Sequence, residues 1–254
     1  GNGYDDIAVL RTDSLITIVW NFLFKDEKGT PETADLDFPG GKSGVTIASG
    51  DFDNNGTVDL VAGTDSEYIY LIPSGGNKLW GKIREIKLTK ASGICVGDVD
   101  SDGFNDILLS YFEQRIGPAG EYGGAGETSG KAAYILWGGK DGFSSLNSAN
   151  LEAMYISYAT MGDYDGDGHK DIAIAVNRDL IDFTAGSIIY YGKGDRQFEK
   201  GKNTITTHGA MYAYTIPGGP GKNDRLVFCN SKKGAVREVV PSYIYWGNSE
   251  GFDA

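Results

Sequence analysis

The chain has 254 residues, of which 40% are hydrophobic, 38 are glycine and 15 are tyrosine, and its formal net charge at pH 7 is −12. This length and composition can bury a sizeable core and suit short strands joined by tight turns. The acidic balance argues against nucleic acid as a partner, because phosphate binding requires clustered Lys and Arg. No apolar run approaches the roughly 20 residues of a membrane-spanning helix. No secretory signal is visible, as expected of a mature or trimmed chain.

The chain begins with half of a motif that is complete three times further on. The complete motif has Asp at positions 1, 3 and 9, Asp or Asn at position 5 and Gly at position 6. In the first copy Asn2 stands at position 5 and Asp6 at position 9, whereas the first two Asp residues are missing. We therefore expect a partial metal site there.

The three complete copies follow at residues 51–59, 98–106 and 163–171. Carboxylates at this spacing, with a Gly that permits a tight turn, allow one short loop to surround a hard cation, and calcium is the ion that fits. The residues at position 7 differ in chemistry, as expected if only the backbone carbonyl binds. The predicted ligand positions are Asp51, Asp53, Asn55, Thr57 and Asp59; Asp98, Asp100, Asp102, Phe104 and Asp106; and Asp163, Asp165, Asp167, His169 and Asp171.

The same loops have two other possible interpretations. An EF-hand requires a bidentate Glu at position 12, but Ala62, Leu109 and Ile174 stand there within apolar runs. Alternatively, Asp, Asn and Gly mark solvated turns in which the side chains cap their own backbone. Three aligned copies with matching flanks favour calcium over this second interpretation.

The motif belongs to a larger repeat of four predicted strands. Aligned on Asp6, Asp59, Asp106 and Asp171, the copies are 53, 47 and 65 residues apart, which is within or near the range of propeller blades. A strand precedes each loop and an apolar strand follows it, so the loop is the turn between strands 1 and 2. An aromatic third strand and a weaker fourth complete the repeat. The predicted third strands are Tyr68–Ile72, Tyr134–Gly138, Ile188–Gly192 and Tyr243–Gly247.

The sequence therefore predicts an all-β fold, a β-propeller of four-stranded antiparallel blades. One domain, residues 1–254, is divided into repeats at about 1–40, 41–90, 91–153, 154–208 and 209–254, with the first and last incomplete. In the fifth repeat Gly218–Val227 stands where a loop belongs, but Pro220, Gly221 and Lys222 replace the carboxylates, and we expect no metal there. The two end fragments are not complementary. A larger ring, of seven blades, is favoured over a closed ring of five.

The two cysteines, Cys95 and Cys229, fall within predicted strands of non-adjacent repeats. We expect them to be small core residues rather than a disulfide pair.

These residues resemble the FG-GAP (VCBS) repeats of the integrin alpha-subunit propeller and of many bacterial surface and secreted proteins. The resemblance covers four or five repeats. Besides the Asp loops, it includes residues 122–126, Tyr-Gly-Gly-Ala-Gly, which are similar to the Phe-Gly/Gly-Ala-Pro signature except that Gly126 replaces Pro. The segments Trp137–Phe143 and Trp246–Phe252 are more similar to the bacterial branch. The resemblance implies calcium in the three complete loops, but it does not by itself imply a ligand.

Recognition is expected on the face opposite the calcium loops, where the long connections between strands 2 and 3 lie. Phe112, Arg115, Tyr122, Arg178 and Arg237 in these connections are the candidate ligand-binding residues. The predicted function is a calcium-stabilised, extracellular, cell-surface or periplasmic module for adhesion, which binds a glycan or a protein and is accompanied by other domains. The alternative is a propeller-type lyase or hydrolase acting on acidic polysaccharide. No nucleophile motif or phosphate-binding glycine loop supports an enzyme.

Overall fold

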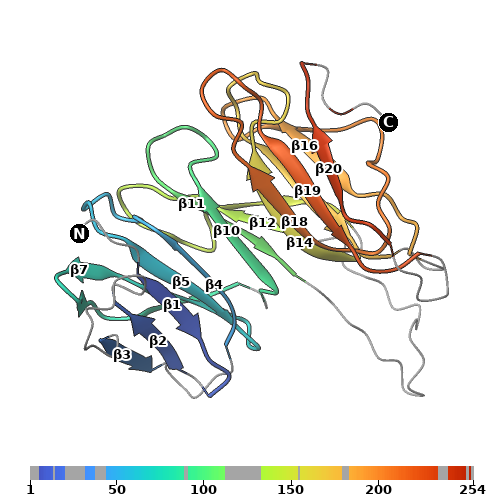
Figure 1. Ribbon diagram of the computed structural model, residues 1–254. Helices are drawn as coiled ribbons and strands as arrows, with labels where there is room; N and C mark the ends of the chain where they lie inside the picture. Colours follow the sequence, from blue (N-terminus) through green and yellow to red (C-terminus); the bar gives the residue numbers. More distant parts are fainter. Residues whose placement is uncertain are drawn as a thin grey trace, which may run out of the picture. The chain divides into compact units, whose positions relative to one another are not determined.

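In a computed structural model, the described residues are 6–13, 15–20, 32–37, 44–88, 91–111, 133–153, 155–178, 183–233, 240–249 and 252. They form twenty strands and no helix (Figure 1). This part of the chain accordingly contains no helix long and apolar enough to cross a membrane. The prediction of an all-β chain is confirmed. The chain divides into two compact units, Gly1–Ile94 and Cys95–Ala254, with the division inside β10.

The N-terminal unit contains two antiparallel sheets, ordered β1-β2-β3 and β4-β5-β6-β9, and a small hairpin, β7-β8. The first sheet comprises β1 (Ile7–Leu10), β2 (Leu15–Val19) and β3 (Thr33–Asp37). The second sheet comprises β4 (Gly44–Gly50), β5 (Asp59–Thr64), β6 (Tyr68–Ile72) and β9 (Arg84–Lys87). The hairpin of β7 (Ser74–Gly76) and β8 (Leu79–Trp80) is inserted between the third and fourth strands.

One apolar cluster lies between these two sheets. Ile16 and Ile18, two residues apart on β2, point to the same face and pack with Leu60, Tyr70 and Ile72 of the second sheet. All five side chains are buried. Two sheets that each supply one apolar face thus form the core of this unit.

The C-terminal unit contains three antiparallel sheets, ordered β10-β11-β12-β13, β14-β15-β16-β17 and β18-β19-β20. The first comprises β10 (Gly93–Gly97), β11 (Asp106–Ser110), β12 (Ala133–Leu136) and β13 (Ser148–Leu151). The second comprises β14 (Ile156–Gly162), β15 (Asp171–Val176), β16 (Ile188–Gly192) and β17 (Phe198–Lys200). The third comprises β18 (Ala210–Ile216), β19 (Arg225–Asn230) and β20 (Tyr243–Trp246).

The middle sheet of the C-terminal unit is buried on both faces, as β15 shows. Every residue of this strand is buried. Ile172 and Ile174 belong to the apolar cluster shared with the sheet of β10 to β13. Ala173 and Ala175 point the other way and belong to the cluster shared with the sheet of β18 to β20. Alternation along one strand therefore supplies two cores, and the sheets stack face to face as the repeat pattern predicts.

The strands agree closely with those expected from the sequence, and each sheet lies within one predicted repeat. Among the described residues, the first and the last sheets have three strands each. The hairpin β7-β8 was not predicted. Cys95 and Cys229 are free, half-buried thiols, as predicted, and burial raises the pKa of the Cys95 thiol. The extent of the domain and the number of blades stay predictions.

Candidate functional site

The three Asp loops are hairpin turns between the first two strands of their sheets. In the first, Gly50 of β4 pairs with Asp59 of β5, and in the third, Gly162 of β14 pairs with Asp171 of β15. Positions 4 and 6 of every loop have positive φ, from 55° to 90°. These residues are Asn54 and Gly56, Ser101 and Gly103, and Gly166 and Gly168. Two left-handed residues bend the loop back on itself, which explains the fixed Gly at position 6.

The Asp at position 1 organises the loop through backbone amides. Asp51 Oδ1 accepts a hydrogen bond from Asn55 N at 3.1 Å, and Asp51 Oδ2 accepts one from Gly56 N at 2.8 Å. Asp98 makes the equivalent pair of bonds in the second loop. In the third loop Asp163 accepts from Gly166 N and Gly168 N instead. Each loop is therefore shaped by its own carboxylates.

The Asp at position 9 is buried in every loop and joins three strands. Asp106 Oδ2 accepts from Val99 N at 2.7 Å, and Asp106 Oδ1 accepts from Gly138 N, just after β12, at 2.8 Å. Asp59 and Asp171 bind the equivalent amides. The loop between strands 1 and 2 is thereby tied to the connection that follows strand 3.

Burial of these carboxyl groups raises their pKa. The pKa of Asp106 is raised to about 6 and that of Asp171 to about 7, chiefly because both groups are desolvated. The carboxylates at positions 3 and 5 add repulsion, whereas the two amide hydrogen bonds oppose the rise. A bound cation would relieve both effects, because it favours the ionised form.

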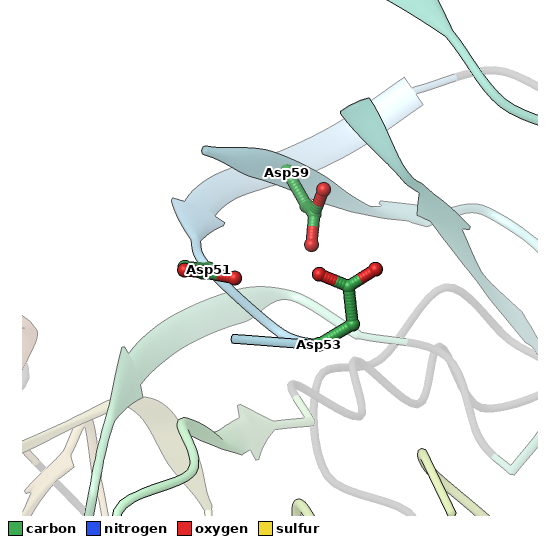
Figure 2. A group of neighbouring side chains, drawn as sticks. All are labelled: Asp51, Asp53 and Asp59. Atoms are coloured by element: carbon green, nitrogen blue, oxygen red, sulfur yellow. The ribbon is translucent and has the colours of Figure 1, made fainter. Parts of the chain in front are cut away.

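In each loop the carboxylates at positions 1, 3 and 9 converge, as Figure 2 shows for Asp51, Asp53 and Asp59. One oxygen from each of the three side chains lies within 4.8 Å of the others. The other two groups are Asp98, Asp100 and Asp106, and Asp163, Asp165 and Asp171. All donors are oxygens, the ligand type that a hard divalent cation takes. The three clusters could therefore hold metal ions.

The remaining predicted ligands are not members of these three clusters. At position 5, Asn55, Asp102 and Asp167 each accept the amide of position 7 through one side-chain oxygen, at 2.7–2.9 Å. Their metal contact, and that of the carbonyls of Thr57, Phe104 and His169, stays a prediction. Of the partial first site, Asp6 is exposed and Asn2 lies outside the described residues.

The fifth hairpin differs from the Asp loops at the ninth position. The ladder pairs Ile216 with Arg225 across eight intervening residues, the same number as between Gly50 and Asp59. Arg225, not Asp224, therefore holds the place of the ninth-position Asp. Asp224 instead accepts from Gly218 N at 2.9 Å and from Asp163 N at 3.0 Å.

Of the candidate ligand-binding residues, Phe112, Arg115, Tyr122 and Arg237 lie outside the described part of the chain. Arg178 follows β15 at the end remote from Asp171, and its guanidinium carbon lies 5.3 Å from the ring centroid of Tyr155. Sequence reasoning missed Arg196, which contacts the second Asp loop. Its position four residues after Gly192, in the turn that follows the third strand, was the available signal.

Comparisons with known proteins agree with this geometry. The FG-GAP-like repeat family matches residues 51–109, which contain the first two Asp loops. Human integrin alpha-8 is 26% identical over 234 residues, covering 83% of this chain and 21% of that protein. This chain thus spans about a fifth of that relative's length.

Among solved structures, the chain is similar to the crystal structure of BBS1N in complex with ARL6DN, soaked with lead. The TM-score is 0.53 at 15% identity, over 89% of this chain and 59% of that one. At this identity the likeness shows the fold alone, which is a β-propeller. The match of residues 51–109 and the similarity to integrin alpha-8 support the predicted resemblance to integrin alpha-like FG-GAP repeats.

Proposed function

We propose that this chain is a calcium-stabilised propeller module that binds a protein partner in adhesion at the cell surface or outside the cell. The observation that carries the proposal is the set of three Asp clusters, each built by the same loop. Because the chain spans only 21% of integrin alpha-8, the partner and the role of the whole protein are parts of the proposal.

Calcium suits these loops better than magnesium. Calcium takes 6–8 oxygen ligands in a flexible geometry, whereas magnesium demands a near-ideal octahedron and keeps several waters. The side chains of positions 1, 3 and 9 offer one oxygen each to a common point. Position 5, the carbonyl of position 7 and water supply the rest in this proposal. Calcium is plentiful outside the cell, which supports an extracellular or surface location.

The ion has a structural role in this proposal. Asp59 already links the loop amide of Phe52 to the amide of Ser74, after the third strand. A cation bound to Asp51, Asp53 and Asp59 would neutralise three carboxylates that otherwise repel one another. It would also connect three strands of the sheet at one end. Calcium would thus stiffen the scaffold that presents the loops of the opposite end.

The partner would bind at that opposite end. Arg178, His208 and Lys232 come from three different connections there. Lys232 Nζ lies 4.5 Å from the ring centroid of Phe183, and the backbone of Gly209 donates to Phe183 O at 2.7 Å. These contacts gather positive charge and an aromatic ring on a chain of net charge −12. An acidic protein surface is complementary to them.

Thermal unfolding tests the proposal. The chelator-treated chain is melted alone, with excess calcium and with excess magnesium. We expect calcium to raise the melting temperature by several degrees and magnesium to raise it much less, because a ligand that binds only the folded state stabilises it. Identical melting in chelator and in calcium would contradict the proposal. A calcium-loaded panel of surface-protein ectodomains and glycans then distinguishes a protein partner from a sugar, with Arg178→Glu as the variant that should lose binding.

A further inference from the structure

Arg196 joins the second Asp loop to the neighbouring sheet. It lies in the turn between β16 and β17, whereas the loop lies between β10 and β11. Its Nε donates to Asp100 Oδ2 at 2.5 Å, and its Nη2 lies 3.6 Å from Asp102 Oδ2. The side chain of Asp100 is only 5% exposed. This is the shortest ion pair that the described residues form at any of the three loops.

The guanidinium of Arg196 is also held from two other sides. Its carbon lies 4.8 Å from the ring centroid of Trp137, and its Nη1 donates to Asn147 Oδ1 at 3.3 Å. Trp137 is itself buried. An Arg fixed by an aromatic face, an amide and two carboxylates cannot easily swing away when a second cation approaches.

The backbone at Arg196 supports the importance of these contacts. Asp195 and Arg196 have φ of 49° and 63°, so both central residues of this hairpin turn are left-handed, as in type I′ turns. The second of these positions usually carries Gly. In the preceding sheet the residue four after the third-strand Gly138 is Gly142, which also has positive φ, 75°. An Arg at such a position is strained, and its contacts with the second loop offset the strain.

A matched turn exists in the N-terminal unit. Lys78, four residues after Ser74, has φ of 64° and its Nζ lies 5.5 Å from the ring centroid of Trp20. It forms an ion pair with Glu32, which belongs to none of the Asp loops. The same turn position thus places a cation over a Trp twice, but of these two residues only Arg196 contacts a carboxylate of a described Asp cluster, that of Asp100.

We propose that Arg196 is a built-in counter-charge for the second Asp loop, which competes with calcium for Asp100 and Asp102. The proposal rests on the calcium-binding function proposed above. With no ion bound, the guanidinium offsets the repulsion among the loop carboxylates and keeps the loop folded. With calcium bound, the same positive charge repels the ion across a short, weakly screened distance. The second loop therefore binds calcium more weakly than the first and depends less on it.

Calorimetric titration of the chelator-stripped full chain with calcium tests this. The proteins are the wild type, Arg196→Gln, Arg196→Lys and the matched control Lys78→Gln. We expect one calcium site of the wild type, that of the second loop, to become about tenfold tighter in Arg196→Gln, within the roughly 10- to 100-fold range by which outer residues tune metal sites. Arg196→Lys, which keeps the charge, and Lys78→Gln should retain the wild-type affinity.

Melting in chelator provides the second readout. Arg196→Gln should melt below the wild type in chelator, and this difference should shrink when calcium is saturating. Unchanged or weaker calcium binding in Arg196→Gln would overturn the inference, since a residue that merely positions the loop would lose affinity when removed. If no protein of the set, wild type included, binds calcium, the proposed function itself fails. The two failures are therefore distinguishable.

Discussion

The second Asp hairpin (β10-β11) and the fifth hairpin (β18-β19) occupy the same place in their repeats, but they are stabilised in different ways. In the Asp hairpin, Asp98, Asp100 and Asp106 converge on one point, where they could hold an ion. In the β18-β19 hairpin, Arg225 stands where the ninth-position Asp is expected from the strand register. Its loop docks on the third Asp loop instead: Asp224 N donates to Asp163 O at 2.8 Å, and Asp163 N donates back to Asp224 Oδ2 at 3.0 Å.

The difference shows that the loop of each repeat is stabilised by a contact, and that the kind of contact differs between loops. A loop of clustered carboxylates requires a counter-charge, whereas a loop of Gly, Pro and Lys requires none and can use a neighbouring loop. Lys170 Nζ, 3.6 Å from Asp224 Oδ2, adds an ion pair to this docking. Calcium dependence should therefore be confined to the Asp hairpins.

The largest expected effect is the loss of a ninth-position Asp. Asp106→Ala removes the acceptor of two buried amides, those of Val99 and Gly138. Two buried amides would then lack an acceptor, and the ion would lose a ligand. Together these losses should lower the free energy of unfolding by about 3–5 kcal/mol in calcium. Urea unfolding with and without chelator measures it. Asp106→Asn, which keeps one acceptor oxygen, is the control and should lose less free energy of unfolding. A change below about 1 kcal/mol in Asp106→Ala would contradict the role of Asp106 as the acceptor of two buried amides.

Asp224→Ala provides the contrasting variant in the fifth hairpin. It removes the acceptor of the Gly218 and Asp163 amides and the partner of Lys170. Because these groups are only partly buried, we expect a loss of about 2 kcal/mol. The loss should be equal in calcium and in chelator. If the loss of stability vanished in chelator, the fifth hairpin would depend on an ion, and the contrast between it and the Asp hairpins would be wrong.

The Asp loops and the strands beside them could be predicted from the sequence because they are set by local residues. Asp at positions 1, 3 and 9 of one loop, with Gly at position 6, fixes a turn within nine residues, and the apolar strands beside it follow the same repeat. The strands around Asp59, Asp106 and Asp171 were therefore found correctly from spacing alone.

What could not be predicted depends on pairing between distant segments. The register that puts Arg225 in the place of the ninth-position Asp is set by the ladder between β18 and β19, which a local motif does not specify. The contact of Arg196 with Asp100 joins residues 96 apart in the sequence. It depends on how two sheets stack, which no spacing within one repeat reveals.

The pH dependence should have opposite signs with and without calcium. In chelator, burial raises the pKa of Asp171 to about 7 from an unfolded value near 3.8. The folded chain then keeps a proton that the unfolded chain releases, so this contribution to stability is complete below pH 3.8 and is lost as the pH rises through about 7. The melting temperature in chelator should fall from pH 5.5 to pH 8, by an amount on the order of a few degrees.

With saturating calcium the slope should reverse, because protons and the ion compete for the same carboxylates. Asp171→Asn is the control and should flatten the dependence in chelator, since it removes one of the two carboxyl groups whose pKa is raised most. A melting temperature in chelator that rises steadily from pH 5.5 to pH 8 would contradict the raised pKa of Asp171 as the cause of the pH dependence.

The smallest expected effect distinguishes docking from ion binding within one loop. Asn223 Nδ2 donates to Tyr164 O at 2.9 Å, and a Cβ on Gly166 would lie 2.4 Å from Asn223 Oδ1. Position 4 of the third loop is thus Gly where the other loops have Asn54 and Ser101, because the fifth hairpin lies over it. Asn223→Ala should cost about 1 kcal/mol in urea unfolding, whereas Lys222→Ala, an exposed neighbour, should cost almost nothing. Equal losses in the two variants would mean that general disturbance of the hairpin, and not this hydrogen bond, attaches it to the third loop.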